Sequence, residues 1–185
     1  MTPYGRDFYL NDPLFVARHL LGFLVVHTHP ERGAIIGRIV ETEAYRGTED
    51  LACHASKGRT ARTEVMFGPP GRAYVYLIYG MYEMLNFVTW PKDIPAAVLI
   101  RGIEPVKGIE RTSDGPGKLT KAMGITRELN GISLDGPRLF VAPDLELVDS
   151  QVEAGPRIGV DYAGEWAERP WRFLIKNNNH VSRPR

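Results

Sequence analysis

Ala34-Ile-Ile-Gly-Arg-Ile-Val-Glu-Thr-Glu-Ala-Tyr45 is the stretch that decides the fold, because it begins apolar and ends in ionisable and aromatic side chains. The pattern predicts one long strand, and side chains two apart on a strand share a face. We therefore expect one face to pass from an aliphatic floor to two carboxylates and a ring. That face carries Ile35, Ile39, Glu41, Glu43 and Tyr45. A carboxylate beside a π-surface suits a hydrolase acting on a flat ring system, although an ordinary strand leaving the core has the same pattern.

The composition is typical of one globular domain in a reducing compartment. The chain has 185 residues, of which 43% are hydrophobic and 24% charged. The single cysteine, Cys53, excludes an internal disulfide and a cysteine-based metal cluster. The N-terminus lacks a signal peptide and no apolar run could span a membrane, so we expect a cytoplasmic protein. The net charge of +1 does not favour a nucleic-acid binder, but basic side chains cluster between residues 55 and 72. Such a cluster is also what a solvated surface looks like.

The order of apolar and turn-forming segments predicts an α+β fold centred on a largely antiparallel sheet, with no linker in the chain. Residues 46–73 are polar and glycine-rich, and we expect a long functional loop with short helical pieces there. The expected helices are Leu14–Leu21 and Gly117–Met123. The expected strands are Phe23–His27, Ala34–Tyr45, Tyr74–Tyr79, Met84–Thr89, Ala96–Arg101, Leu139–Val141, Arg157–Val160 and Trp171–Ile175.

A second candidate is Tyr74-Val-Tyr-Leu-Ile-Tyr-Gly-Met-Tyr82, where Gly80 marks a tight bend directly after Tyr79. Tyrosines that approach the tip of a hairpin could stack on nucleic-acid bases or wedge between them. Tyrosines are also good strand residues that fill cores, so this pattern alone favours packing.

Two further features are weaker. Gly115-Pro-Gly-Lys-Leu-Thr-Lys121 combines glycines before a short helix with Lys118 and Lys121, an arrangement that can hold a phosphate although it is not a Walker loop. His54 could be a metal ligand, a general acid or a ring that packs against a substrate. The other histidines show no ligand spacing with His54, so we expect no catalytic metal.

Several long motifs occur in an order that resembles the alkyladenine DNA glycosylase family, also called the 3-methyladenine or N-methylpurine DNA glycosylases. The resemblance runs from about Phe8 to the C-terminus. The motifs that carry it are Val40-Glu-Thr-Glu-Ala-Tyr-Arg-Gly47, His54, Met66-Phe67, Tyr74–Tyr82 with Asn86, Leu99-Ile-Arg-Gly-Ile-Glu-Pro105, Gly115-Pro-Gly-Lys-Leu119, Arg157-Ile-Gly-Val160 and Ala163-Gly-Glu-Trp166.

The resemblance implies a compact bacterial-type glycosylase: one domain over residues 1–185, with a curved sheet, surrounding helices and a protruding β-hairpin. Such an enzyme binds duplex DNA as a monomer near the nucleoid and needs no cofactor. It flips a damaged purine out of the stack and hydrolyses its N-glycosidic bond, which leaves an abasic site for base excision repair. The implied substrates include 3-methyladenine, 7-methylguanine, hypoxanthine and ethenoadenine.

The same resemblance assigns roles to residues. Glu43 matches the base that activates water, with Arg101 and the backbone carbonyl of Ile158 holding that water. Tyr45 would stack on one face of the flipped base, and His54 and Tyr76 on the other. The remaining assignments are Tyr79 as the wedge, Met66 beside it, Asn86 against the amino group of guanine, and Arg59, Arg62, Lys118 and Lys121 as phosphate contacts.

Two alternatives remain beside the glycosylase. One is a module that binds damaged nucleic acid without catalysis, against which the presence of both Glu43 and Arg101 argues. The other is a hydrolase of free nucleosides, which would need neither the Tyr79 hairpin nor the basic loop.

Overall fold

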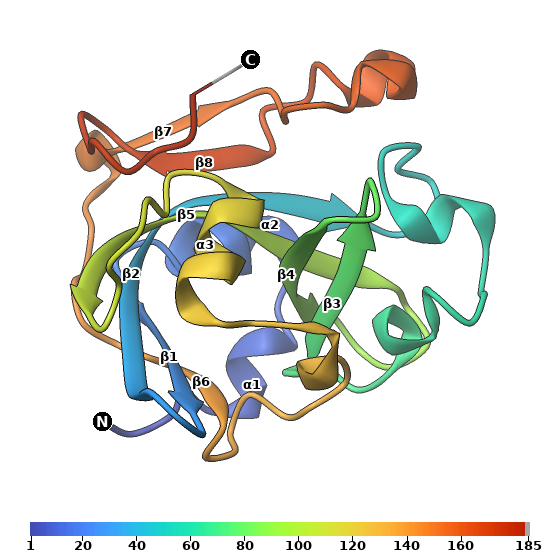
Figure 1. Ribbon diagram of the computed structural model, residues 1–185. Helices are drawn as coiled ribbons and strands as arrows, with labels where there is room; N and C mark the ends of the chain where they lie inside the picture. The colour runs from blue at the N-terminus through green and yellow to red at the C-terminus, as the bar shows by residue number, and fades with distance from the viewer. Residues whose placement is uncertain (184–185) are drawn as a thin grey trace.

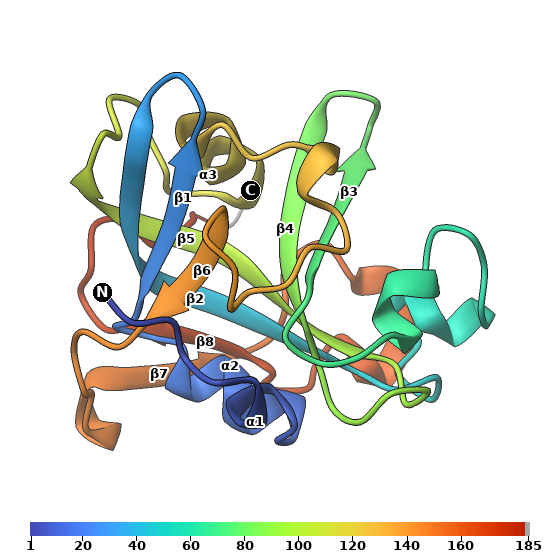
Figure 2. The same ribbon diagram turned by 90° about the horizontal axis from the view of Figure 1, so that it is seen from below.

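An antiparallel sheet organises the computed structural model, which describes residues 1–183. Its strands follow the order β3-β4-β5-β2-β1-β6, and β8 pairs with both β2 and β7. The sheet curls, so that the β1–β2 pair and the β3–β4 hairpin rise on either side of helix α3 (Pro116–Met123; Figure 2). The strands are β1 (Leu24–His29), β2 (Gly33–Arg46), β3 (Ala73–Ile78), β4 (Tyr82–Thr89), β5 (Ala96–Lys107), β6 (Leu139–Ala142), β7 (Val152–Gly155) and β8 (Arg172–Ile175).

Short helices cover the sheet (Figure 1). They are α1 (Arg6–Tyr9), α2 (Pro13–His19) and α3 (Pro116–Met123), with short 3₁₀ segments η1 (His54–Lys57), η2 (Glu64–Phe67), η3 (Arg127–Leu129), η4 (Asp149–Gln151) and η5 (Asp161–Trp166). Helix α2 begins where the Asp12 side chain accepts a 2.9 Å hydrogen bond from the Leu14 amide. After α2 the chain turns at Gly22, where φ is +87° and a Cβ would lie 2.6 Å from the Leu145 carbonyl oxygen. A side chain at this position would be strained by the positive φ and would clash with Leu145, so glycine is required there.

One main core cluster draws residues from Phe8 to Val141, so the described residues form a single domain. Side chains of α2, of α3 and of the central strands meet in this cluster. Among residues 1–183, no helix is long and apolar enough to cross a bilayer.

The α+β class and the antiparallel sheet are confirmed, and most expected elements are present with shifted ends. The expected strand over Arg157–Val160 is wrong. The strand in this region is β7, which ends at Gly155, directly before Pro156. Proline has no amide to donate to a ladder, and the Arg157 side chain turns inward to a buried ion pair with Asp50.

The expected continuous face of β2 is also wrong, because paired bulges interrupt β2 and β5. The register runs from Ile39 opposite Ile103 to Glu41 opposite Gly102, and then to Thr42 opposite Ile100. Val40 on β2 and Arg101 on β5 therefore have no residue paired opposite them, and each is the extra residue of a bulge.

The bulges reverse the alternation of side chains on both strands. Before them Ile39 and Ile103 face the main core, and after them Ala44 and Ile100 do. Thr42 confirms the reversal, since its hydroxyl donates to the Ala17 carbonyl of α2. Glu41, Glu43 and Tyr45 consequently lie on the face away from α2, where Arg101 meets both carboxylates.

Thr42→Val should lower the free energy of unfolding by about 1 kcal/mol, because the buried 2.8 Å bond to the Ala17 carbonyl is lost without a change of volume. Urea denaturation measures this change. The matched control is Thr28→Val on the exposed end of β1, expected to stay within about 0.5 kcal/mol of the parent. Equal effects of the two substitutions would contradict the role of Thr42.

Candidate active site

A buried carboxylate, Glu43, lies at the centre of the candidate site. It is 0% exposed, and both of its oxygens are held. Its Oε1 accepts a 2.7 Å hydrogen bond from the Ile158 amide and lies 3.3 Å from Arg101 Nη1, and its Oε2 accepts a 2.8 Å bond from the Tyr45 hydroxyl. Hydrogen bonds to the charged form offset part of the cost of burying a carboxylate. The arrangement therefore fixes both the position and the orientation of Glu43.

The contact that the structure shows between Ile158 and Glu43 runs through the amide N–H of Ile158. The role of its carbonyl in holding water stays a prediction. The structure brings Arg101, from β5, and the Ile158 amide, from the loop after β7, to the same carboxylate.

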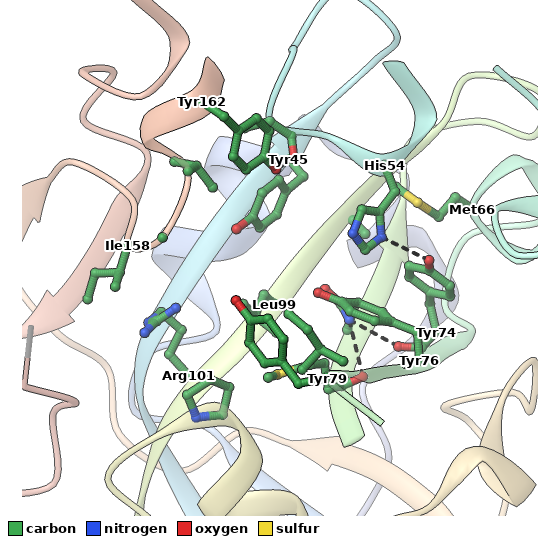
Figure 3. A pocket seen from close by; sticks show the side chains of 18 residues that line it. Tyr45, His54, Met66, Tyr74, Tyr76, Tyr79, Leu99, Arg101, Ile158 and Tyr162 are labelled. Atoms are coloured by element: carbon green, nitrogen blue, oxygen red, sulfur yellow. Dashed lines mark hydrogen bonds between the residues drawn. The ribbon is translucent and has the colours of Figure 1, made fainter. Parts of the chain in front are cut away.

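A cavity of about 320 Å³ opens beside this carboxylate and is lined mainly by aromatic and aliphatic side chains. Figure 3 shows Tyr45 and Tyr162 together at one edge and His54, Tyr74 and Tyr76 across from them. The rings of His54 and Tyr76 meet edge to face with centroids 4.6 Å apart. The volume suits a small planar ligand, and the walls offer π-surfaces from separate segments of the chain.

The aromatic wall is uncharged at neutral pH. Burial, followed by the nearby Arg62 and Lys57, lowers the pKa of His54 from 6.5 to about 4. Burial and the adjacent Glu43 raise the pKa of Tyr45, and burial raises that of Tyr76. Of the residues that line the cavity, only Arg101 is a cation at neutral pH.

Asn86 lies in the cavity wall, where its Nδ2 donates to the backbone carbonyls of Tyr74 (3.2 Å) and Met84 (3.3 Å). These bonds fix the amide, so a ligand meets a side chain with little freedom to move. Met66 also lines the cavity, and it is only 2% exposed. Met66 and Tyr79 line the same cavity, and the role of Met66 beside the wedge stays a prediction.

Tyr79 occupies the tip of the β3–β4 hairpin. It is 85% exposed and adopts a φ of +52°, which is unusual for a residue other than glycine. Met81, also at the tip, is 67% exposed. A large apolar surface is thus held out in solvent at the mouth of the cavity, where packing within the chain cannot explain it.

Two of the four expected phosphate-binding cations form ion pairs within the chain. Arg59 contacts Glu64 at 2.7 Å and Asp93 at 3.1 Å, and Lys118 contacts Asp114 at 2.9 Å. Arg62 lies 5.0 Å from the centre of the Tyr76 ring. Among the described residues, Lys121 makes no ion pair, and it is exposed. All four remain predictions as phosphate contacts.

The Asp50–Arg157 pair was not expected from the sequence. Arg157 donates to both carboxylate oxygens of Asp50, at 2.6 and 2.8 Å, and to the Ala44 carbonyl at 2.9 Å. Its guanidinium lies 4.8 Å from the centre of the Tyr45 ring. This pair fastens the Ile158 loop to the end of β2. No local signal reveals it, since its partners are 107 positions apart.

Tyr162 is another residue of the site that no sequence pattern indicated. It stands on η5, is 72% exposed and lines the cavity. By contrast, no three His, Cys, Asp or Glu side chains within residues 1–183 come together as a metal site.

Comparison with known proteins agrees with this geometry. The family described as methylpurine-DNA glycosylase matches residues 7–179. A Myxococcus xanthus protein named "Putative 3-methyladenine DNA glycosylase" is 54% identical over 96% of this chain and 92% of its own. Proteins of the same name from Legionella pneumophila (strain Corby) and Methanocella arvoryzae are 51% and 53% identical, over 99% of this chain and 100% and 97% of theirs. The chain therefore belongs to the methylpurine-DNA glycosylase family, and its reaction is the hydrolysis of an N-glycosyl bond in DNA.

Proposed function

We propose that this enzyme is a monofunctional glycosylase that takes a damaged purine, 3-methyladenine above all, out of duplex DNA and releases it with a water molecule activated by Glu43. The observation that carries the proposal is a fully buried carboxylate, held by three donors, beside a cavity with uncharged aromatic walls. The exposed tyrosine at the mouth suits an enzyme that must fill the gap left by a flipped nucleotide.

The chemistry requires little beyond these groups. As the glycosidic bond breaks, its electron pair goes to the base and positive charge builds on the sugar. Glu43 stabilises that charge and accepts a proton from the water whose oxygen attacks C1′. Arg101 and the Ile158 amide hold the carboxylate in place throughout. No amine nucleophile is needed, because water forms the new bond.

The protonation state of His54 favours bases that are already cationic. A purine alkylated at N3 or N7 is positively charged in the nucleotide and leaves as a neutral base. A neutral purine such as hypoxanthine needs a proton as it leaves, and His54, with its pKa of about 4, is not a proton donor at neutral pH. We expect cationic lesions to be released faster than neutral ones.

Glu43→Gln should reduce base release by about 10²–10⁴-fold, because the amide cannot accept the proton of the water. The measurement is single-turnover release from a methylated or hypoxanthine-containing duplex, with binding followed separately by fluorescence anisotropy. Duplex binding should persist, and release by the parent enzyme should survive a chelator.

Glu31→Gln, in the exposed turn between β1 and β2, is the matched control and should leave release unchanged. Release at the parent rate by Glu43→Gln would overturn the mechanism. A parent enzyme that binds lesions without releasing them would support a binding module.

Tyr79→Ser should weaken duplex binding by roughly tenfold to a hundredfold, the loss expected for one stacking aromatic ring. The exposed side chain contributes little to stability, so the melting temperature should hardly change. The exposed Val148→Ser, away from the cavity, serves as the control. If the parent releases hypoxanthine from free inosine as fast as from the duplex, the enzyme is a nucleoside hydrolase and the wedge is not needed.

Asn86→Ser should increase release of guanine-derived bases relative to adenine-derived bases. The shorter side chain leaves room for the exocyclic amino group, which the fixed amide of Asn86 would meet. Competition between 7-methylguanine and 3-methyladenine in one methylated duplex measures the ratio directly. An unchanged ratio in Asn86→Ser would remove its role in selectivity, and the exposed Asn179→Ser is the control.

A further inference from the structure

The chain after β8 returns to the candidate site, although its sequence carries no motif that predicts this. Figure 1 shows the segment in red, turning back beside β8. Its backbone packs closely on β5, where a Cβ added to Gly102 would lie 2.6 Å from the His180 carbonyl oxygen. The segment ends its approach at Ser182, which is 5% exposed.

Ser182 contacts both charged groups behind Glu43. Its amide donates a 2.6 Å hydrogen bond to Glu41 Oε2. Its hydroxyl oxygen accepts from Nε and Nη2 of Arg101, each at 3.4 Å. The hydrogen bond from the Ser182 amide is shorter than the contacts of the Ser182 hydroxyl, and its acceptor, Glu41, is fully buried.

Glu41 in turn braces Arg101. Its Oε1 lies 3.4 Å from Arg101 Nε and 3.0 Å from Arg172 Nη1. Arg101 therefore has Glu41 against Nε and Glu43 against Nη1, with Ser182 beside both Nε and Nη2. An arginine side chain has many rotamers, and contacts at several of its nitrogens restrict it to one of them.

We propose that Ser182 and Glu41 are positioning residues that hold Arg101 against Glu43 from behind, so that the C-terminal segment is a working part of the active site. The inference rests on the proposed function of Glu43. Neither Ser182 nor Glu41 lines the aromatic cavity.

Ser182→Pro tests the proposal, because proline lacks the amide that binds Glu41. Ser182→Ala is the matched control, since it keeps the amide and loses only the longer hydroxyl contacts. Single-turnover release from a methylated duplex should fall roughly tenfold to a hundredfold in Ser182→Pro. Duplex affinity should stay at the parent value in both variants, and Ser182→Ala should lose less rate than Ser182→Pro, because it keeps the amide bond to Glu41.

A double-mutant cycle with Arg101→Met separates positioning from general damage to the fold. If Ser182 acts through Arg101, Ser182→Pro should cause no further loss of rate once Arg101 is absent. The same proportional loss in both backgrounds, a loss of affinity in place of rate, or an unchanged rate in Ser182→Pro would each overturn the proposal.

If Ser182→Pro does not fold, Glu41→Gln takes its place in the same cycle, because it keeps an acceptor for the Ser182 amide and removes the charge. The outcomes that would overturn the proposal are the same, with Glu41→Gln in place of Ser182→Pro. Glu43→Gln, measured in parallel, keeps the two proposals apart. If it is inactive while Ser182→Pro and Glu41→Gln match the parent, only the positioning role fails. If it releases bases normally, the proposed function fails.

Discussion

Two buried carboxylates that share one arginine are the constraint on which the site depends. Glu41 and Glu43 are both fully buried on the same face of β2, and each would be costly there without a partner. Arg101 meets both, and Arg172 supplies a second positive charge on the Glu41 side. Two negative and two positive groups thus balance in a small volume. These four groups come from β2, β5 and β8. The site therefore requires that β2 pairs with both β5 and β8 in the sheet.

The paired bulges make this cluster compatible with a core. With regular alternation, Glu41 and Glu43 would share a face with Ile39, and Arg101 would share a face with Ile103. Charges would then point into the main core. The extra residue on each strand, Val40 on β2 and Arg101 on β5, reverses the alternation of side chains at neighbouring positions of the two strands. Ile39, Ile100 and Ile103 therefore face the core, and Glu41, Glu43 and Arg101 lie together on the other face of the sheet.

Properties encoded in nearby residues could be predicted from the sequence, and properties that join distant segments could not. The turn at Gly80 and the strand over Ala34–Tyr45 follow from local chemistry, and each is present. The resemblance supplied the grouping of Glu43, Arg101 and Ile158, which spacing alone does not give. The bulges have no local signature. The Asp50–Arg157 pair and the contact from Ser182 to Glu41 join residues 107 and 141 positions apart. The strand expected over Arg157–Val160 failed for the same reason, because a distant partner turned Arg157 inward.

The distribution of charge around the cavity bears on how a product would leave. The cations near the aromatic walls lie close to the rings of Tyr76 and Tyr45, as Arg62 at 5.0 Å and Arg157 at 4.8 Å from the ring centres. Glu43 is the negative group nearest to Tyr45, to which it is hydrogen-bonded. A cationic base in the cavity is attracted to this carboxylate as well as to the rings. In the proposed mechanism the base is neutral once the glycosidic bond has broken, and Glu43 has gained a proton. The electrostatic attraction between the base and Glu43 would then be lost, and this loss would favour release of the product.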